Sequence, residues 1–278
     1  MTIDALVNPP LSVLYEAADD PAVQARLLQV REAMTRLRFH EGLRRTWEAA
    51  RAEAAIREAV ALSLLEGVRT SVDDLRAWTL SDTNLDRKNT DPGLALALGI
   101  WRSQWNLASS FPALNSRHGH TPLAHPLPRV IAGCHRDIAS VMLAGGWVEA
   151  DMVAIPRDTM HLSYAQELIA SSLPAPLLCA ALIAHFRFRE VFTPASGAVG
   201  SAVARWLLVT RGVDPTGVAV ISALDGTDAA RASQMMAGWV RADTAGVARW
   251  YLHALDAMIH GARIGADVAR HVQAGRLH

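Results

Sequence analysis

Between two apolar helical stretches lies a turn rich in small residues. Its residue types are the ones in this chain that best suit the binding of an anion. Apolar residues recur at helical spacing before it, at Leu178, Leu182 and Phe186, and again after it. Residues 192–197, Phe-Thr-Pro-Ala-Ser-Gly, interrupt this pattern with proline and glycine. A loop that enters a helix presents unpaired N–H groups and the positive end of the helix dipole, which suit an anion such as phosphate. The predicted anion-binding or nucleotide-binding loop comprises Ala195, Ser196, Gly197, Ala198, Gly200, Ser201 and Arg205.

Three arginines near this turn could supply positive charge. Arg205 lies four residues after Ser201, one turn further along the same helical face. Two roles are open for it: contact with Glu66 or a ligand phosphate, or a structural ion pair. Arg187 and Arg189, just before the turn, are further candidates for contact with an anion.

The same stretch resembles the central motif of the Fic (Fido-fold) family, HPFx[D/E]GNGRxxR, which lies between two helices. With Phe192 on the Phe of the motif, Gly197 falls on the second Gly of GNG. The Leu pair of the family and the Gly that ends its second helix fall on Leu207, Leu208 and Gly212. The resemblance implies an all-α Fic-like fold.

The residues that carry the chemistry of the family are replaced. Glu190 stands in place of the catalytic His, and Pro194 stands in place of the acid that binds the metal. Ser196 replaces the Asn, and the two Arg fall on Ala198 and Ser201. Fic proteins move AMP, or a related phosphoryl-linked group, from a nucleotide to a hydroxyl, which needs a base and a divalent ion. Glu190 could accept a proton, but its charge would repel the phosphates.

A second segment, residues 58–71, resembles the inhibitory helix that precedes the core of many Fic proteins, EAxxSSxIEGxxT. Ser63, Glu66, Gly67 and Thr70 match this pattern, and Leu62 replaces one Ser. In such proteins the Glu pairs with the second Arg of the motif and blocks the γ-phosphate. That Arg is a serine in this chain, so Glu66 could instead be a surface or capping residue before a glycine that ends the helix.

The remaining pattern is helical, and it leads to an all-α, Fic-like domain with an N-terminal helical arm. The arm, residues 1–80, carries the inhibitory-helix-like segment, and residues 81–278 form the Fic-like core. We expect an extended entry at 8–11, which reads Asn-Pro-Pro-Leu. One small β-hairpin could form within 147–160, where an apolar run lies between turn residues. Helices are predicted over 21–40, 41–66, 72–79, 92–108, 127–143, 162–172, 175–189, 228–239 and 244–272.

Composition limits the classes of function. Apolar residues make up 51% of the 278 residues and the formal net charge is zero, so nothing draws the chain to nucleic acid or to an anionic membrane. No run reaches the roughly 18 apolar residues of a membrane span, and the first residues lack the pattern of a signal peptide. Two cysteines are too few for a disulfide framework. We expect a cytoplasmic protein, and the oligomeric state stays open.

Histidines give little support for a metal centre. His118, His120 and His125 lie in a proline-rich loop without a convergent acid, which favours a solvated loop, so no metal site is predicted. The polar residues Asp225, Asp228, His253 and His260 lie near apolar helices, again without a third ligand in recognisable spacing.

Three functions remain open on the sequence. A degenerate Fic protein without ordinary AMP transfer would bind a nucleotide-like ligand, ATP or another nucleotide with Mg²⁺, or a protein partner. A divergent nucleotidyl or phosphoryl transferase would use a base other than His, with Glu190 as the candidate. A purely structural or regulatory helical protein would leave the groove empty.

Overall fold

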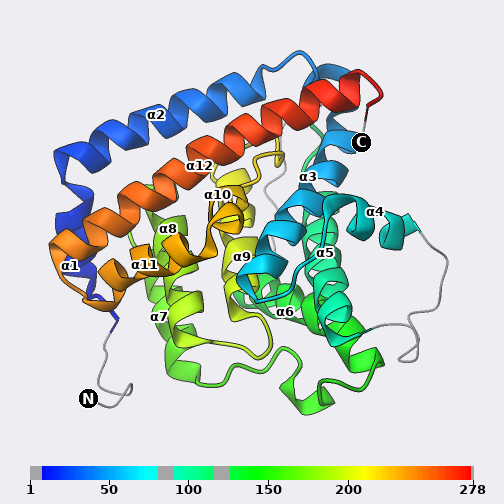
Figure 1. Cartoon of the computed structure of the whole chain (residues 1–278). Helices are drawn as coiled ribbons and strands as arrows, with labels where there is room; N and C mark the ends of the chain where they lie inside the picture. The colour runs from blue at the N-terminus through cyan, green and yellow to red at the C-terminus, as the bar shows by residue number, and fades with distance from the viewer. Residues whose placement is uncertain (1–7, 81–90, 116–125, 277–278) are drawn as a thin grey trace.

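The computed structural model of the chain describes residues 8–80, 91–115 and 126–276, and every regular element in these ranges is helical (Figure 1). The expected all-α class is therefore confirmed. The helices are α1 (Leu11–Ala18), α2 (Pro21–Arg38), α3 (Leu43–Leu65), α4 (Val72–Leu80), α5 (Pro92–Ser110), α6 (Leu127–Ala144), the 3₁₀ turn η2 (Ala150–Met152), α7 (Thr159–Ala170), α8 (Ala175–Arg189), α9 (Ser196–Thr210), α10 (Ala223–Thr227), α11 (Ala229–Val240) and α12 (Thr244–Gln273).

The helical hairpin α8–α9 forms the centre of the molecule. All residues of 177–186 in α8 are buried, because this helix is apolar on every side. Small residues on α9 let the two helices approach closely: a Cβ added to Gly200 would lie 2.6 Å from the Cβ of Phe186. The turn between α8 and α9 is therefore held by two closely packed helices.

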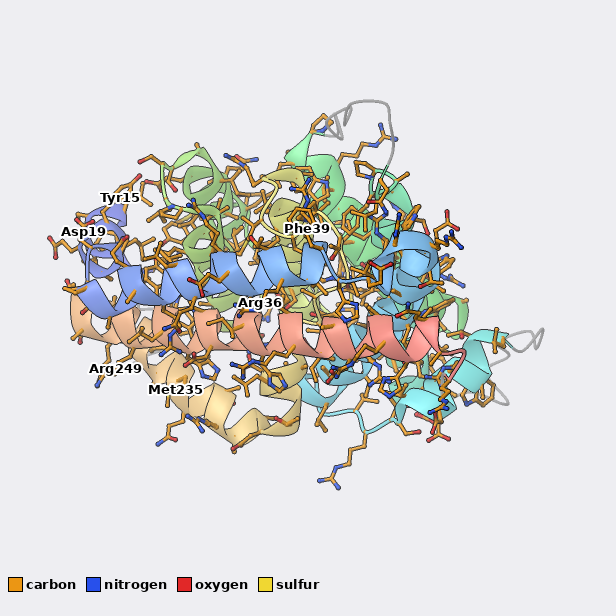
Figure 2. All side chains as sticks on the ribbon, turned by 90° about the horizontal axis from the view of Figure 1, so that it is seen from above. Tyr15, Asp19, Arg36, Phe39, Met235 and Arg249 are labelled. Carbon is orange, nitrogen blue, oxygen red and sulfur yellow. The ribbon has the colours of Figure 1, made fainter. Side chains whose placement is uncertain are left out.

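Helices α2 and α12 lie side by side and run in the same direction across one face of the molecule (Figures 1 and 2). Trp250 of α12 donates a hydrogen bond through Nε1 to the carbonyl of Ala180 in α8, at 2.8 Å. One hydrophobic cluster takes in buried residues from α1 to α12. The residues predicted as an arm and those predicted as a core thus pack into a common interior.

One local expectation was wrong. Instead of a β-hairpin, residues 147–158 form η2 and turns and α7 begins at Thr159, because the apolar run is interrupted at Ala154, whose φ is +61°. The N–H groups of this segment also bond elsewhere: Ala154 donates to Nδ1 of His135 and Arg157 donates to the carbonyl of Val191. The expected entry at 8–11 is non-helical up to Pro10, whose backbone is extended, and α1 begins at Leu11, the last residue of that range.

The crossing of α5 and α6 gives a matched pair of glycines for a test of stability. A Cβ on Gly99 would lie 1.9 Å from the carbonyl oxygen of Ile138, whereas no described atom lies within 4 Å of a Cβ on Gly133. We expect Gly99→Ala to lower the free energy of unfolding by about 1–3 kcal/mol, because the helices must separate. Gly133→Ala should raise it by about 0.5–1 kcal/mol, because alanine favours the helix.

Urea denaturation of both variants measures the difference. Equal stability of the two variants would contradict the close approach of α5 and α6.

Candidate functional site

A cavity of about 510 Å³ opens at the turn between α8 and α9. Its walls come from this turn, from the end of α3 and from one face of α11. Of the predicted loop residues, Ala195, Ser196 and Gly197 line the cavity. The others do not line it and are buried behind this wall, namely Ala198, Gly200, Ser201 and Arg205.

The backbone conformation of the turn places the first residues of α9 in the wall of the cavity. The Thr193–Pro194 peptide is cis, and Ala195 takes a left-handed conformation with φ of +58° immediately before the helix. The hydroxyl of Ser196 points away from the cavity and donates to the carbonyl of Phe186 at 2.7 Å. The N-cap residue of α9, Ala195, has no side-chain group that could cap the helix, so the first N–H groups of the helix are available to an anion from elsewhere.

Glu66 supplies an anion at this position. It follows α3 directly, and its carboxylate lies beside the N–H of Ala198, which favours the charged form of the carboxylate. Its Oε1 lies 3.0 Å from the place of a Cβ on Gly197. Burial raises the pKa of Glu66, while the Ala198 N–H and the guanidinium of Arg187 act in the opposite direction. Glu66 therefore contacts the second helix of the motif although the arginine expected as its partner is absent.

The two neighbours of Glu66 in the inhibitory-helix-like segment support the helix end instead. Ser63 is fully buried and donates to the carbonyl of Ala59 at 2.7 Å, and its own carbonyl accepts from Val68 at 2.8 Å. Gly67 has a φ of +82°, the conformation that suits glycine after a helix. These two residues fix the end of α3 and hence the place of Glu66.

Arg187, Asp225 and His253 form a buried cluster beneath the cavity. Nη1 of Arg187 lies 2.9 Å from Oδ2 of Asp225, and Nε2 of His253 lies 2.8 Å from Oδ1 of the same carboxylate. Burial alone would raise the pKa of Asp225, but the hydrogen bond from His253 and the charge of Arg187 hold this pKa below its ordinary value. The three residues come from α8, α10 and α12, so no local spacing in the sequence signals the cluster.

Glu190 lies at the rim of the cavity. It ends α8 in a left-handed conformation, its side chain is 69% exposed, and its carboxylate pairs with Nη1 of Arg157. The N–H of Arg157 also donates to the carbonyl of Val191 at 2.8 Å. Glu190, which stands in place of the catalytic His of the Fic motif, thus forms an ion pair with Arg157 in the segment after η2.

Arg205 belongs to a different, buried polar cluster. It is 3% exposed, donates through Nη2 to the carbonyl of Gly217 at 2.9 Å, and donates through Nη1 to Oε1 of Gln104. Its charge also acts on the fully buried carboxyl of Glu58. Neither Glu66 nor the cavity wall is among these contacts.

The side chains around the cavity do not form a set for Mg²⁺. Pro194, at the position of the metal-binding acid, has no carboxylate, Glu66 lies at the first turn of α9, and Glu190 pairs with Arg157. Within residues 8–80, 91–115 and 126–276 no group of three or more His, Cys, Asp or Glu could hold a metal ion. His118, His120 and His125 lie outside the described residues. In the described ranges, moreover, no helix combines the length and the apolar character needed to cross a membrane.

Two buried histidines near the site predict an acid-labile fold. Nδ1 of His135 accepts from Ala154 at 2.8 Å and its ring stacks on Phe192, while His185 bonds to the carbonyl of His161 at 2.8 Å. Burial lowers the pKa of each to about 4. In the unfolded chain both titrate near their ordinary pKa of 6.5. The stability they provide is therefore complete above pH 6.5 and is lost as the pH falls toward 4.

We expect the free energy of unfolding to fall by about 2 kcal/mol for each of the two histidines when the pH is lowered from 7.5 to 5. Urea denaturation at both pH values measures this loss. The loss of unfolding free energy between the two pH values should be smaller in His135→Gln, whatever the absolute stability of that variant. It should be unchanged in His271→Gln, which alters an exposed residue. The same pH dependence in wild type and His135→Gln would contradict a neutral, buried His135.

Comparison with known proteins supports the fold. No family model and no curated protein matches the sequence, but 18 chains of solved structures match the structure. Among them is the crystal structure of a Fic family protein from Desulfovibrio desulfuricans G20, with a TM-score of 0.61 and 12% sequence identity. The match covers 92% of this chain and 75% of that chain. The chain therefore has the Fic fold, as the resemblance of its motifs implied.

Proposed function

We propose that this Fic-fold chain binds a nucleotide-like ligand at the N-terminus of α9 and does not carry out ordinary AMP transfer. The observation that supports the proposal most directly is the position of the Glu66 carboxylate at the first turn of α9, where its Oε1 lies 3.0 Å from the place of a Cβ on Gly197 and beside the N–H of Ala198. A helix N-terminus that already holds an anion of the chain itself offers the same N–H groups to the anion of a ligand.

The other walls of the cavity suit the remainder of such a ligand. Leu65, Phe188, Met236 and Val240 provide an apolar surface beside the polar turn. The volume of about 510 Å³ is within the range of about 300–1,000 Å³ that is usual for small-molecule sites. A ligand with an apolar or aromatic body and an anionic end matches this arrangement.

The loss of ordinary AMP transfer follows from the groups that the reaction needs. AMP transfer requires a base for the attacking hydroxyl, a divalent ion and positive charge for the leaving phosphates. Glu190 pairs with Arg157 at the rim, and Ser201 is buried behind the wall. The alternative, a transferase that uses Glu190, requires this carboxylate to leave Arg157 and turn toward the cavity.

Calorimetric titration of the wild-type chain and of Glu66→Gly with AMP, ATP, GTP and CTP tests the proposal. Each triphosphate is titrated with and without Mg²⁺. Heat of binding for at least one nucleotide, in the variant if not in the wild type, supports the proposal. The absence of binding in both proteins would contradict it and would favour a groove that takes up a protein partner or stays empty.

A further inference from the structure

We propose that Arg187 replaces the two missing arginines of the motif as the contact for the ligand's anion, and that this anion is a single phosphoryl group rather than a polyphosphate with Mg²⁺. Asp225 and His253 act as positioning residues for Arg187. This inference rests on the proposed function and names the ligand class and the cation of the same site.

The geometry places Arg187 beside the anion that the site already holds. Its side chain is 15% exposed and lines the cavity. Its Cγ lies 3.0 Å, and its Nε 3.7 Å, from the place of a Cβ on Gly197, so the side chain runs alongside the first turn of α9. Its charge also acts on the carboxylate of Glu66. An anion that displaces Glu66 therefore meets the N–H of Ala198 and the guanidinium of Arg187 together.

The cluster beneath the cavity fixes the orientation of Arg187. Nη1 of Arg187 donates to Asp225, which leaves other N–H groups of the guanidinium for a ligand. Asp225 is held in turn by His253 at 2.8 Å, and both side chains are 7% exposed. A guanidinium held in this way loses little side-chain entropy when a ligand binds, which favours affinity.

The charges around the cavity limit the ligand to a small anionic group. Among the described residues that line the cavity, Arg187 is the only cationic side chain, and the same lining holds two carboxylates, Glu66 and Glu190, the second of which pairs with Arg157. A triphosphate would need several cations or a metal ion to balance its charge. One phosphoryl group needs only the helix N-terminus and one arginine. The ligand class is thus a phosphate monoester with an apolar or aromatic body, such as a nucleoside monophosphate.

Titration of AMP, and of ATP with and without Mg²⁺, into Glu66→Gly tests the ligand class. We expect AMP to bind more tightly than ATP, and Mg²⁺ to bring no gain for ATP. ATP with Mg²⁺ binding more tightly than AMP would overturn the inference while leaving the proposed function intact. No binding of any nucleotide to Glu66→Gly would contradict the proposed function and this inference together.

Second variants in the same Glu66→Gly background test Arg187. Arg187→Gln should weaken AMP binding at least about tenfold, since it removes a charged hydrogen bond. Arg187→Lys should restore part of the loss because it keeps the charge, and Asp225→Asn should weaken binding less than Arg187→Gln because Arg187 remains. The matched control is Arg189→Gln, two residues further along the chain, whose Nε bonds to Asn8 at 3.1 Å.

Thermal unfolding checks that each variant folds, and Arg187→Lys keeps the test meaningful if Arg187→Gln does not fold. Equal AMP affinity of the Arg187→Gln and Arg189→Gln variants would overturn the role of Arg187.

Discussion

Replacement of Glu66 by glycine should tighten the binding of a nucleoside monophosphate about ten- to hundredfold. In the wild type a ligand must first displace the Glu66 carboxylate, which lies at the first turn of α9 beside the N–H of Ala198. The interaction of an N–H group with a charged group contributes about 1.5–3 kcal/mol, which corresponds to this change in affinity. Glycine at 66 also removes a negative charge from the wall of the cavity. Isothermal calorimetry with AMP on both proteins measures the change.

Glu66→Gln serves as the matched control for charge. The glutamine side chain still occupies the place beside Ala198, but it lacks the charge that repels a phosphate, so the AMP affinity of this variant should lie between those of wild type and Glu66→Gly. Glu190→Gln, at the exposed rim, should change the affinity much less. Wild-type affinity in both Glu66 variants would show that this carboxylate does not compete with the ligand.

Removal of Arg205 should lower the free energy of unfolding by about 3–5 kcal/mol. Its guanidinium is buried and bonds to Gln104 and to the carbonyl of Gly217. Its loss leaves the buried Glu58 with the smaller effect of the Arg187 charge and with a contact from the Ser222 N–H at 3.2 Å. Oε1 of Glu58 has no hydrogen-bond partner among the described residues, so little else compensates for its burial. Urea denaturation of Arg205→Ala gives the magnitude.

A double variant distinguishes the interaction between the charges of Arg205 and Glu58 from the loss of packing that any truncation of Arg205 causes. Arg205→Met combined with Glu58→Gln removes both charges and keeps most of the volume, so it should be less destabilised than the sum of the single variants. A loss below about 1 kcal/mol for Arg205→Ala, together with weaker ligand binding, would instead place Arg205 in the binding site.

Helices were predictable because their signals are local. The apolar period of α8 and α9, the proline at the start of α2 and the acid that caps α11 all lie within a few residues of the structure they specify. The short match around Glu66 also located a residue of the candidate site. By contrast, the β-hairpin was wrong because four apolar residues do not reveal that Ala154 turns left-handed toward His135.

Long-range contacts explain what the sequence did not reveal. Helical periodicity shows that Arg205 and Ser201 share a face of α9, but it does not show that this face meets Gln104, which lies 101 residues away in the chain. The contact of Asp225 with Arg187 spans 38 residues and that with His253 spans 28. Each of these residues alone is an ordinary polar residue near an apolar helix. Their joint role depends on the packing of α8, α10 and α12.

The complete burial of residues 177–186 in α8 has a consequence for hydrogen exchange. Amide hydrogens of a helix enclosed on every side exchange with solvent only when the whole domain opens, so α8 belongs to the slowest-exchanging part of the molecule. The cavity turn begins where this helix ends. Local opening at the surface therefore leaves one anchor of the turn in place, and the N-terminus of α9 keeps its position at the cavity.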